Sequence, residues 1–297
     1  MIYYQQGLSS AEVEDRTAIT IKMANAAGES ADKVSQQLTA VWNNFYDGSK
    51  SLEYYADVMT ALGAATASST DEISEGLEKF ASVAETVGLS YEYATAALAT
   101  VTATTRQSAD VVGTAFKTLF ARIQDLEQGE TLDDGTTLGK YSTALMTVGV
   151  NIKDTSGGLK EMDEILDEVG DKWENLDRDA KMALAQTLAG TRQYTQFISL
   201  MDNWDFFEEN VETAKNSTGE LEKQNAIYAQ SWEAARDRVK AAIESIYNKL
   251  LDDDFFITIL NVGEKIISGI DYVIDRLGGL PGVLSLISSI IMKIFSQ

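Results

Sequence analysis

Pro281 is the only proline in this chain of 297 residues. Proline fixes φ and lacks an amide hydrogen, so it interrupts helices, and an average protein carries it at roughly 5% of positions. A chain that almost completely avoids proline can form many helices without internal breaks. Hydrophobic residues make up 44% of the sequence, which is enough to bury a core. These features predict an all-α fold.

Apolar residues recur at helical spacing along most of the chain. In residues 71–88, Ile73, Leu77 and Phe80 follow each other at steps of four and three, which places them on one helix face. A capping-box pattern precedes this stretch at Ser69. The same spacing predicts helices that begin after Ser9 and over residues 30–46, 52–66, 91–105, 109–126, 138–148, 159–176, 178–189, 192–201 and 206–215. We therefore expect an elongated array of amphipathic helices.

The longest regular pattern begins near Gly219. Residues follow at steps of four and three from Leu221 to Ile246, all apolar except Asn225, and no glycine or proline interrupts the chain until after residue 251. This pattern predicts a coiled-coil-like helix of about 30 residues, or ~45 Å. Five positions on this stripe are expected to pack against other helices or a partner: Leu221, Tyr228, Trp232, Val239 and Ile246.

The composition changes after residue 254. The chain as a whole has a formal charge of −22, whereas residues 255–297 carry equal numbers of acidic and basic side chains. Their last apolar run, residues 283–295, is shorter than the ~20 residues that a bilayer span needs, so burial against another helix competes with membrane contact. The residues that would meet a membrane are Phe255, Phe256, Ile259, Ile266, Ile270, Ile274, Ile290 and Phe295.

These patterns predict four parts. Residues 1–128 form an N-terminal helical core, and residues 129–218 form short helices separated by glycine breaks. Residues 219–254 form the long helix, and residues 255–297 form a hydrophobic helical tail.

The residue types limit the chemistry. The sequence has no cysteine and no histidine, which excludes disulfides, thiol nucleophiles, thiolate zinc sites and imidazole bases. Its 46 acidic and 24 basic residues repel a phosphate backbone, so we expect no direct grip on nucleic acid and a preference for basic partner surfaces. Asp177 and Asp179 lack the further ligands of a calcium loop and are more typical of a helix start. We expect no catalytic, cofactor or metal site, and no enzyme.

An aromatic run consists of Trp204, Phe206 and Phe207. Two interpretations remain: a buried connection between helices, or a patch on which a partner docks.

Three phrases, in fixed order and spacing, carry a resemblance. They are GTAFKTLFARIQ, then ALMTVGVNIKDTSGGLKEMDEILDEV, then LAGTRQYTQFISLMDN, and the long helix from Gly219 follows them. Together they resemble the core region of tail tape measure proteins of tailed bacteriophages and prophages, over residues 7–251. The motif positions within them are Gly113, Arg122, Gly149, Gly158, Gly190 and Arg192. Gly113, Gly149 and Gly190 are expected to set helix breaks.

The resemblance implies a protein that packs inside the tail tube during assembly and whose length sets tail length. Such proteins leave the tube ahead of the DNA and assist its passage through the host envelope. The implied partners are tail tube proteins, tail assembly chaperones, further copies of the chain and the host membrane. The implied location is the interior of the virion tail, after synthesis in the bacterial cytoplasm. Family members are usually far longer, so the chain resembles the core of a longer protein.

Two other functions remain as alternatives. A pore-forming or membrane-remodelling helical protein would insert residues 255–295 into a membrane after a trigger. A carboxylate-based hydrolase is disfavoured because no acidic residue lies in an evident apolar pocket.

Overall fold

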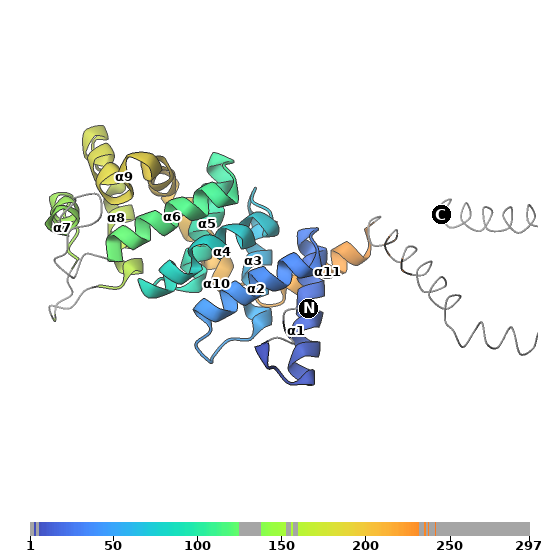
Figure 1. The fold of residues 1–297 in the computed structure, drawn as a ribbon. Coiled ribbons are helices and arrows are strands. Elements are labelled where there is room, and N and C mark those ends of the chain that lie inside the picture. The colour runs from blue at the N-terminus through green and yellow to red at the C-terminus, as the bar shows by residue number, and fades with distance from the viewer. Residues whose placement is uncertain are drawn as a thin grey trace, which may run out of the picture. The chain divides into compact units, whose positions relative to one another are not determined.

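The computed structural model describes residues 6–124, 138–152 and 160–231, with the isolated positions 3, 156, 235, 237 and 241. Within these residues the chain forms eleven α-helices and no strand, which confirms the predicted all-α class (Figure 1). The helices are α1 (Ser10–Ala27), α2 (Ala31–Phe45), α3 (Leu52–Ala65), α4 (Thr70–Thr86), α5 (Tyr91–Thr105), α6 (Ala109–Gln124), α7 (Leu138–Thr147), α8 (Met162–Trp173), α9 (Arg178–Asp202), α10 (Trp204–Lys215) and α11 (Glu220–Ala229).

Serine side chains begin the first five helices. The N-cap hydroxyls of α1 to α5 each accept a hydrogen bond from a backbone amide in the first turn. These bonds satisfy amides that the helix itself leaves without a partner. Ser9 with Glu12 and Ser69 with Glu72 both form complete capping boxes, as their spacing predicts. Local capping chemistry therefore explains why the predicted helix starts agree with the observed ones.

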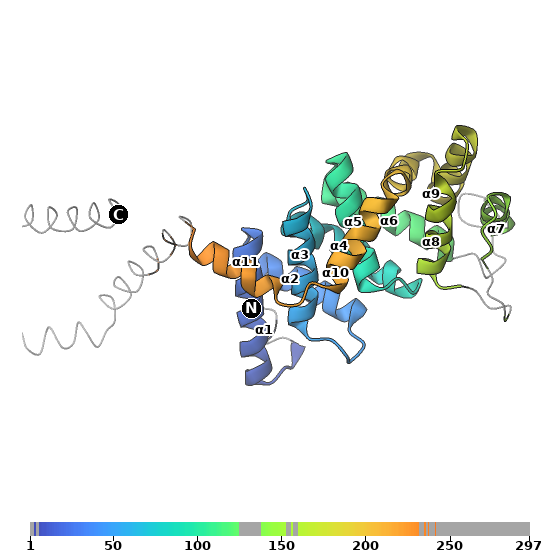
Figure 2. The ribbon, with the colours of Figure 1, turned by 180° about the vertical axis from the view of Figure 1, so that it is seen from behind.

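Helices α3 and α5 form the centre of the core. All residues of α5 between Tyr93 and Thr102 are buried, so this helix has no solvent-exposed face over that stretch. It packs against α3, α4, α9 and α10, and Figure 2 shows α10 lying across α3 and α5. The hydroxyls of Thr95 and Thr100 donate to backbone carbonyl oxygens one turn earlier, at 2.6 Å and 2.8 Å. Small and self-satisfied side chains allow a helix to be buried on every side.

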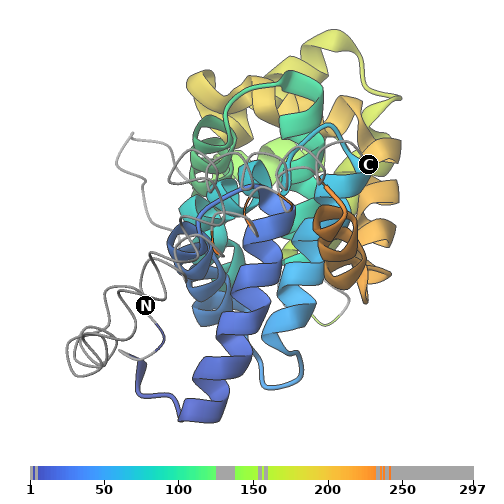
Figure 3. The same ribbon diagram turned by 90° about the vertical axis from the view of Figure 1, so that its right-hand side faces the viewer.

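The N-terminal end of this core is formed by α1, which packs on α2, α3 and α11 (Figure 3, α1 in blue). At the other end, α6 packs on α4 and α9. Residues 1–229 form one compact unit, and residues 230–297 are assigned to a second. Contacts of α6 with α9 and of α10 with α3 join both sides of residue 128 within the first unit, so the predicted divisions at 128 and 218 lie inside it.

The prediction that one uninterrupted helix runs from residue 219 to 251 is wrong. Helix α11 ends at Ala229, and Gln230 and Ser231 form a turn and a bend. The carbonyl oxygen of Ser231 then accepts from the amide of Ala235 at 3.2 Å, as at the start of a new helical turn. Serine favours such a cap position because its hydroxyl can bond nearby amides, and apolar periodicity alone does not register this preference.

Several predicted residues lie outside the described part of the chain. They are Gly158, Trp232, Val239, Ile246 and all the residues proposed to meet a membrane: Phe255, Phe256, Ile259, Ile266, Ile270, Ile274, Ile290 and Phe295. None of the helices in the described part has the length and apolar character needed to cross a bilayer.

Candidate functional site

The motif glycine Gly113 lies in the middle of α6 and does not break the helix, contrary to the prediction. It faces α4, where a Cβ atom added to it would lie 2.5 Å from the carbonyl oxygen of Gly76. Gly76 in turn faces α5, and its own Cβ would lie 2.6 Å from Leu98 Cδ2. Gly113 therefore allows the backbones of α4 and α6 to approach closely, and Gly76 leaves room on α4 for the Leu98 side chain of α5. A glycine in a helix marks either a break or a close contact, and only packing distinguishes them.

Gly149 does end a helix, as predicted. It has φ of 81° after α7, and the amide of Val150 donates to the carbonyl oxygen of Leu145 at 2.9 Å. Leu145 and Val150 are both buried, so the chain reversal is completed by an apolar contact. This is the Schellman arrangement, in which an L residue with a side chain is disfavoured at the glycine position.

Gly190 also breaks a helix, as predicted. With φ of 74° and ψ of 171°, it divides α9 into two segments. A Cβ atom at this position would lie 3.0 Å from the guanidinium group of Arg122 in α6. The structure therefore brings together two motif residues that are 68 positions apart in the sequence, Arg122 and Gly190. Arg192 is exposed and does not join them.

The first predicted packing residue on α11, Leu221, is fully buried. Its backbone amide donates to Asp57 Oδ1 at 2.8 Å, and the amide of Gly219 donates to Asp57 Oδ2 at 3.0 Å. Asp57 belongs to α3 and is 4% exposed, so a buried carboxylate from another helix caps the start of α11. Further along α11, Tyr228 is half-buried and Ile227 is 57% exposed.

Sequence reasoning missed Asp57. The available signal was an acidic residue beyond the first turn of a mostly apolar helix, LEYYADVMTALG, in which the positions on both sides of Asp57 are buried. Polar contacts with α1 add to the same joint: Asn25 Nδ2 donates to Asn225 Oδ1 at 3.0 Å, and Lys22 Nζ lies 2.5 Å from Glu222 Oε2. We call this set of contacts between α11 and helices α1 and α3 the α11 joint.

Carboxylates also fasten α8 to the first turn of α5. Ser90 Oγ donates to Asp163 Oδ2 at 3.0 Å, and the Tyr93 hydroxyl donates to Asp167 Oδ1 at 3.0 Å. Burial raises the pKa of Asp163 to about 6, and the hydrogen bonds from Ser90 oppose this shift. Burial likewise raises the pKa of Asp167, against the hydrogen bond from Tyr93. Neighbouring carboxylates, Asp167 and Glu161 for Asp163 and Asp171 and Glu164 for Asp167, raise both pKa values further.

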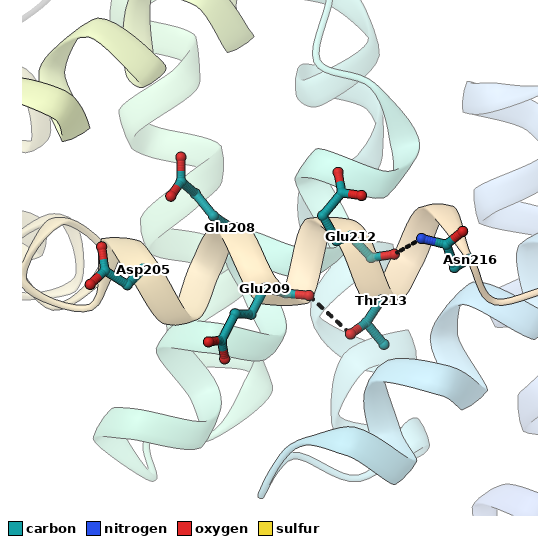
Figure 4. A pocket seen from close by; sticks show the side chains of 6 residues that line it. All are labelled: Asp205, Glu208, Glu209, Glu212, Thr213 and Asn216. Carbon is teal, nitrogen blue, oxygen red and sulfur yellow. Dashed lines mark hydrogen bonds between the residues drawn. The ribbon is translucent and has the colours of Figure 1, made fainter.

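The outer face of α10 is a second acidic region (Figure 4). Asp205, Glu208, Glu209 and Glu212 line a hollow along this helix. Figure 4 shows Glu208 and Glu209 pointing away from one another, as expected for adjacent helical positions. Neighbouring carboxylates that diverge in this way contribute negative charge to the surface and do not form an acid/base pair.

The aromatic run on the other side of α10 is mostly buried. Trp204 is 8% exposed and Phe207 is 1% exposed, and their rings lie 4.7 Å apart between centroids. The six-membered part of the Trp204 ring covers Gly170 of α8, where a Cβ atom would overlap it. This confirms a buried connection between helices, which was one of the two interpretations of the run. Asp177 accepts from the amide of Ala180 at 2.8 Å, which confirms it as the start of α9.

In the part of the chain that the structure describes, no three His, Cys, Asp or Glu side chains are grouped as a metal site would require. What the sequence motifs bring together are helix contacts: close backbone approaches, glycine reversals and carboxylates at helix starts. These features define an all-α protein whose distinctive residues position helices.

The comparison with protein families agrees with this class. A family model described as phage-related minor tail protein matches residues 2–190. The match covers more than half of the chain, and the chain belongs to this family of phage tail proteins. It extends from the start of the compact unit to the Arg122–Gly190 contact. No solved structure matches the chain.

Proposed function

We propose that this chain is the core of a tail tape measure protein, which occupies the tail interior, sets tail length and assists DNA passage through the host envelope. The observation that carries the proposal is the match to the phage minor tail protein family over residues 2–190. Within that match lie two of the three phrases that resemble tape measure proteins, and the third begins there with LAG. The role requires helix packing and association and no catalysis.

The fold limits which residues can act as a ruler. A single helix extends ~1.5 Å per residue, so residue number converts into distance only where the helix runs alone. Residues 1–229 form a compact unit in which helices pack side by side, for example α4 on α6 and α10 on α5, so their lengths do not add along one axis. We therefore expect the compact unit to contribute a constant length, and the part of the protein after residue 229 to contribute in proportion to its residue number.

The charge fits passage of DNA. A formal charge of −22 repels the phosphate backbone, so the protein would not retain DNA that follows it through the tube. The same charge favours basic surfaces on its partners, for which tail tube proteins, assembly chaperones and further copies of the chain are proposed.

The test is tail length in the phage that encodes the chain. An in-frame deletion after residue 229, which leaves the compact unit whole, should shorten the tails seen by electron microscopy by up to ~1.5 Å per residue removed. An in-frame duplication of the same segment is the matched control and should lengthen them. Tails of unchanged length in both variants would refute the proposal that this segment sets tail length.

A further inference from the structure

A cleft lies between the loop that joins α2 to α3 and the loop that joins α4 to α5. It has a volume of about 370 Å³ and is lined by residues 44–47, 50, 54, 55, 85 and 88–92. This volume is in the range of small-ligand sites. Of the helix contacts described above, only Ser90, which caps α5 and donates to Asp163, also lines the cleft.

Tyrosine rings form much of the cleft. Tyr46 stacks on Trp42 with ring centroids 3.8 Å apart, yet 48% of its surface remains exposed. Tyr54 is fixed by a hydrogen bond from its hydroxyl to Glu92. Tyr55 donates from its hydroxyl to the carbonyl oxygen of Phe45 at 2.8 Å. The aromatic surface is therefore held in place before any ligand arrives.

Carboxylates accompany these rings. Asp47, Glu85 and Glu92 line the cleft, and Lys50 is the only basic residue among the lining positions. Hydrogen bonds from Ser49 lower the pKa of Asp47, so this carboxylate stays ionised. Burial and then the Asp47 charge raise the pKa of Tyr55 to about 12. The cleft therefore carries negative charge beside aromatic faces, which is unfavourable for phosphate and favourable for a cation.

The chain itself shows how a cation sits there. Lys50 Nζ lies over the Tyr54 ring, 4.2 Å from its centroid. Lys50 is exposed and belongs to a loop, so its side chain can leave this position. A planar guanidinium would use the site better than an ammonium, because it can stack on a tyrosine ring while donating two hydrogen bonds to a carboxylate.

From this geometry we infer that the cleft binds an arginine side chain of a basic partner protein. The excess of acidic over basic residues in the chain, which gives the charge of −22, means that electrostatic complementarity selects a partner with a basic surface. One arginine enters between Tyr46 and Tyr54, and Glu92 and Asp47 accept its hydrogen bonds. The inference does not depend on the proposed role in tail length.

The test uses the ¹⁵N-labelled full chain and N-acetyl-arginine methylamide as the probe, at low salt. Amide shifts should concentrate in residues 44–55 and 85–92, with a millimolar dissociation constant. N-acetyl-citrulline methylamide has the same shape without the charge and should bind at least about fivefold more weakly. Equal shifts from the citrulline probe, or from N-acetylglucosamine as a neutral saccharide, would overturn the inference.

Variants separate the cleft from the general charge of the protein. Glu92→Gln should weaken the affinity for the arginine probe about fivefold. Glu209→Gln removes the same charge from the outer face of α10 and should change this affinity less than twofold. Lys50→Met should strengthen binding, because it vacates the Tyr54 face. Lys117→Met, on exposed α6 surface, is its charge-matched control. Strengthening by both lysine variants alike, or no effect of Glu92→Gln, would contradict an arginine site in the cleft.

Discussion

Replacing Asp57 with alanine tests whether one buried carboxylate holds α11 in place. The change removes both acceptors of the Gly219 and Leu221 amides, at 3.0 Å and 2.8 Å. A hydrogen bond to a charged group contributes about 1.5–3 kcal/mol. Part of the gain from two such bonds is offset by the cost of burying the carboxylate, so we expect a net loss of about 2–3 kcal/mol.

The loss should be local before it is global. Leu221 is the only fully buried side chain on α11. The remaining contacts of the α11 joint are one partly exposed ion pair and one half-buried amide pair, which contribute about 0–1.5 kcal/mol each. Without Asp57, α11 should therefore open while the α4–α6 packing persists. Hydrogen exchange measured by mass spectrometry should show faster exchange over residues 217–231 and unchanged protection in α4 and α6.

A double-mutant cycle makes the reasoning refutable. Leu221→Ala alone should cost about 2–4 kcal/mol, because it empties a fully buried site. Once Asp57→Ala has released α11, Leu221 no longer contributes its full burial, so the double variant should lose about 1–2 kcal/mol less than the sum of the single losses. Glu14→Ala removes an exposed charge from α1 and is the control. Additive losses together with unchanged exchange over 217–231 would show that Asp57 does not hold α11.

Two further predictions concern the core and the α8 contact. Gly113→Ala should destabilise the protein by about 1–3 kcal/mol in urea unfolding, because its Cβ would meet the Gly76 backbone at 2.5 Å; Gly139→Ala, with no atom within 4 Å, should instead be neutral or stabilising by up to about 1 kcal/mol. Burial raises the pKa of Asp163 from 3.8 to about 6, so the folded state binds the proton more readily and stability falls as pH rises from about 4 to 6. Asp163→Asn should remove this pH dependence, worth about 1–2 kcal/mol after allowance for solvent screening, and identical pH profiles for the variant and the wild type would contradict the assignment.

The features predicted best from the sequence are helix starts and ends, which depend on interactions between residues close together in the chain. Serine caps act within one helical turn, so Ser9 and Ser69 could be assigned from neighbouring residues alone. Gly149 and Gly190 were assigned correctly where the apolar spacing on both sides of them also stops. Helix α5 was also predicted with its observed bounds, Tyr91–Thr105. The buried environment of α5 was less apparent, because alanine and threonine give a weak apolar stripe even where every position is enclosed.

Contacts between distant parts of the chain could not be predicted. The residues next to Gly113 in sequence are compatible with two roles for this glycine, a helix break or a close contact with another helix. Its contact with the Gly76 backbone shows that the second role applies. Asp57 caps amides more than 160 positions later, so nothing near it in sequence indicates its partner. The end of α11 at Ala229 was missed because the apolar spacing continues through a turn.

Some of the acidic residues of the chain have a structural role, because they lie at the starts of helices. A helix start carries partial positive charge, so it is the place in a helical protein where a carboxylate stabilises rather than repels. Asp57 occupies the start of α11 and Asp177 the start of α9. Asp163, against Ser90 at the start of α5, is the exception, because burial disfavours its charged form and raises its pKa. The central helices, by contrast, are enclosed by apolar, small and hydroxyl side chains. Because charge-dependent contacts weaken with salt and pH while apolar packing changes far less, the outer helices α8 and α11 should separate from the unit under conditions that leave α3 and α5 packed.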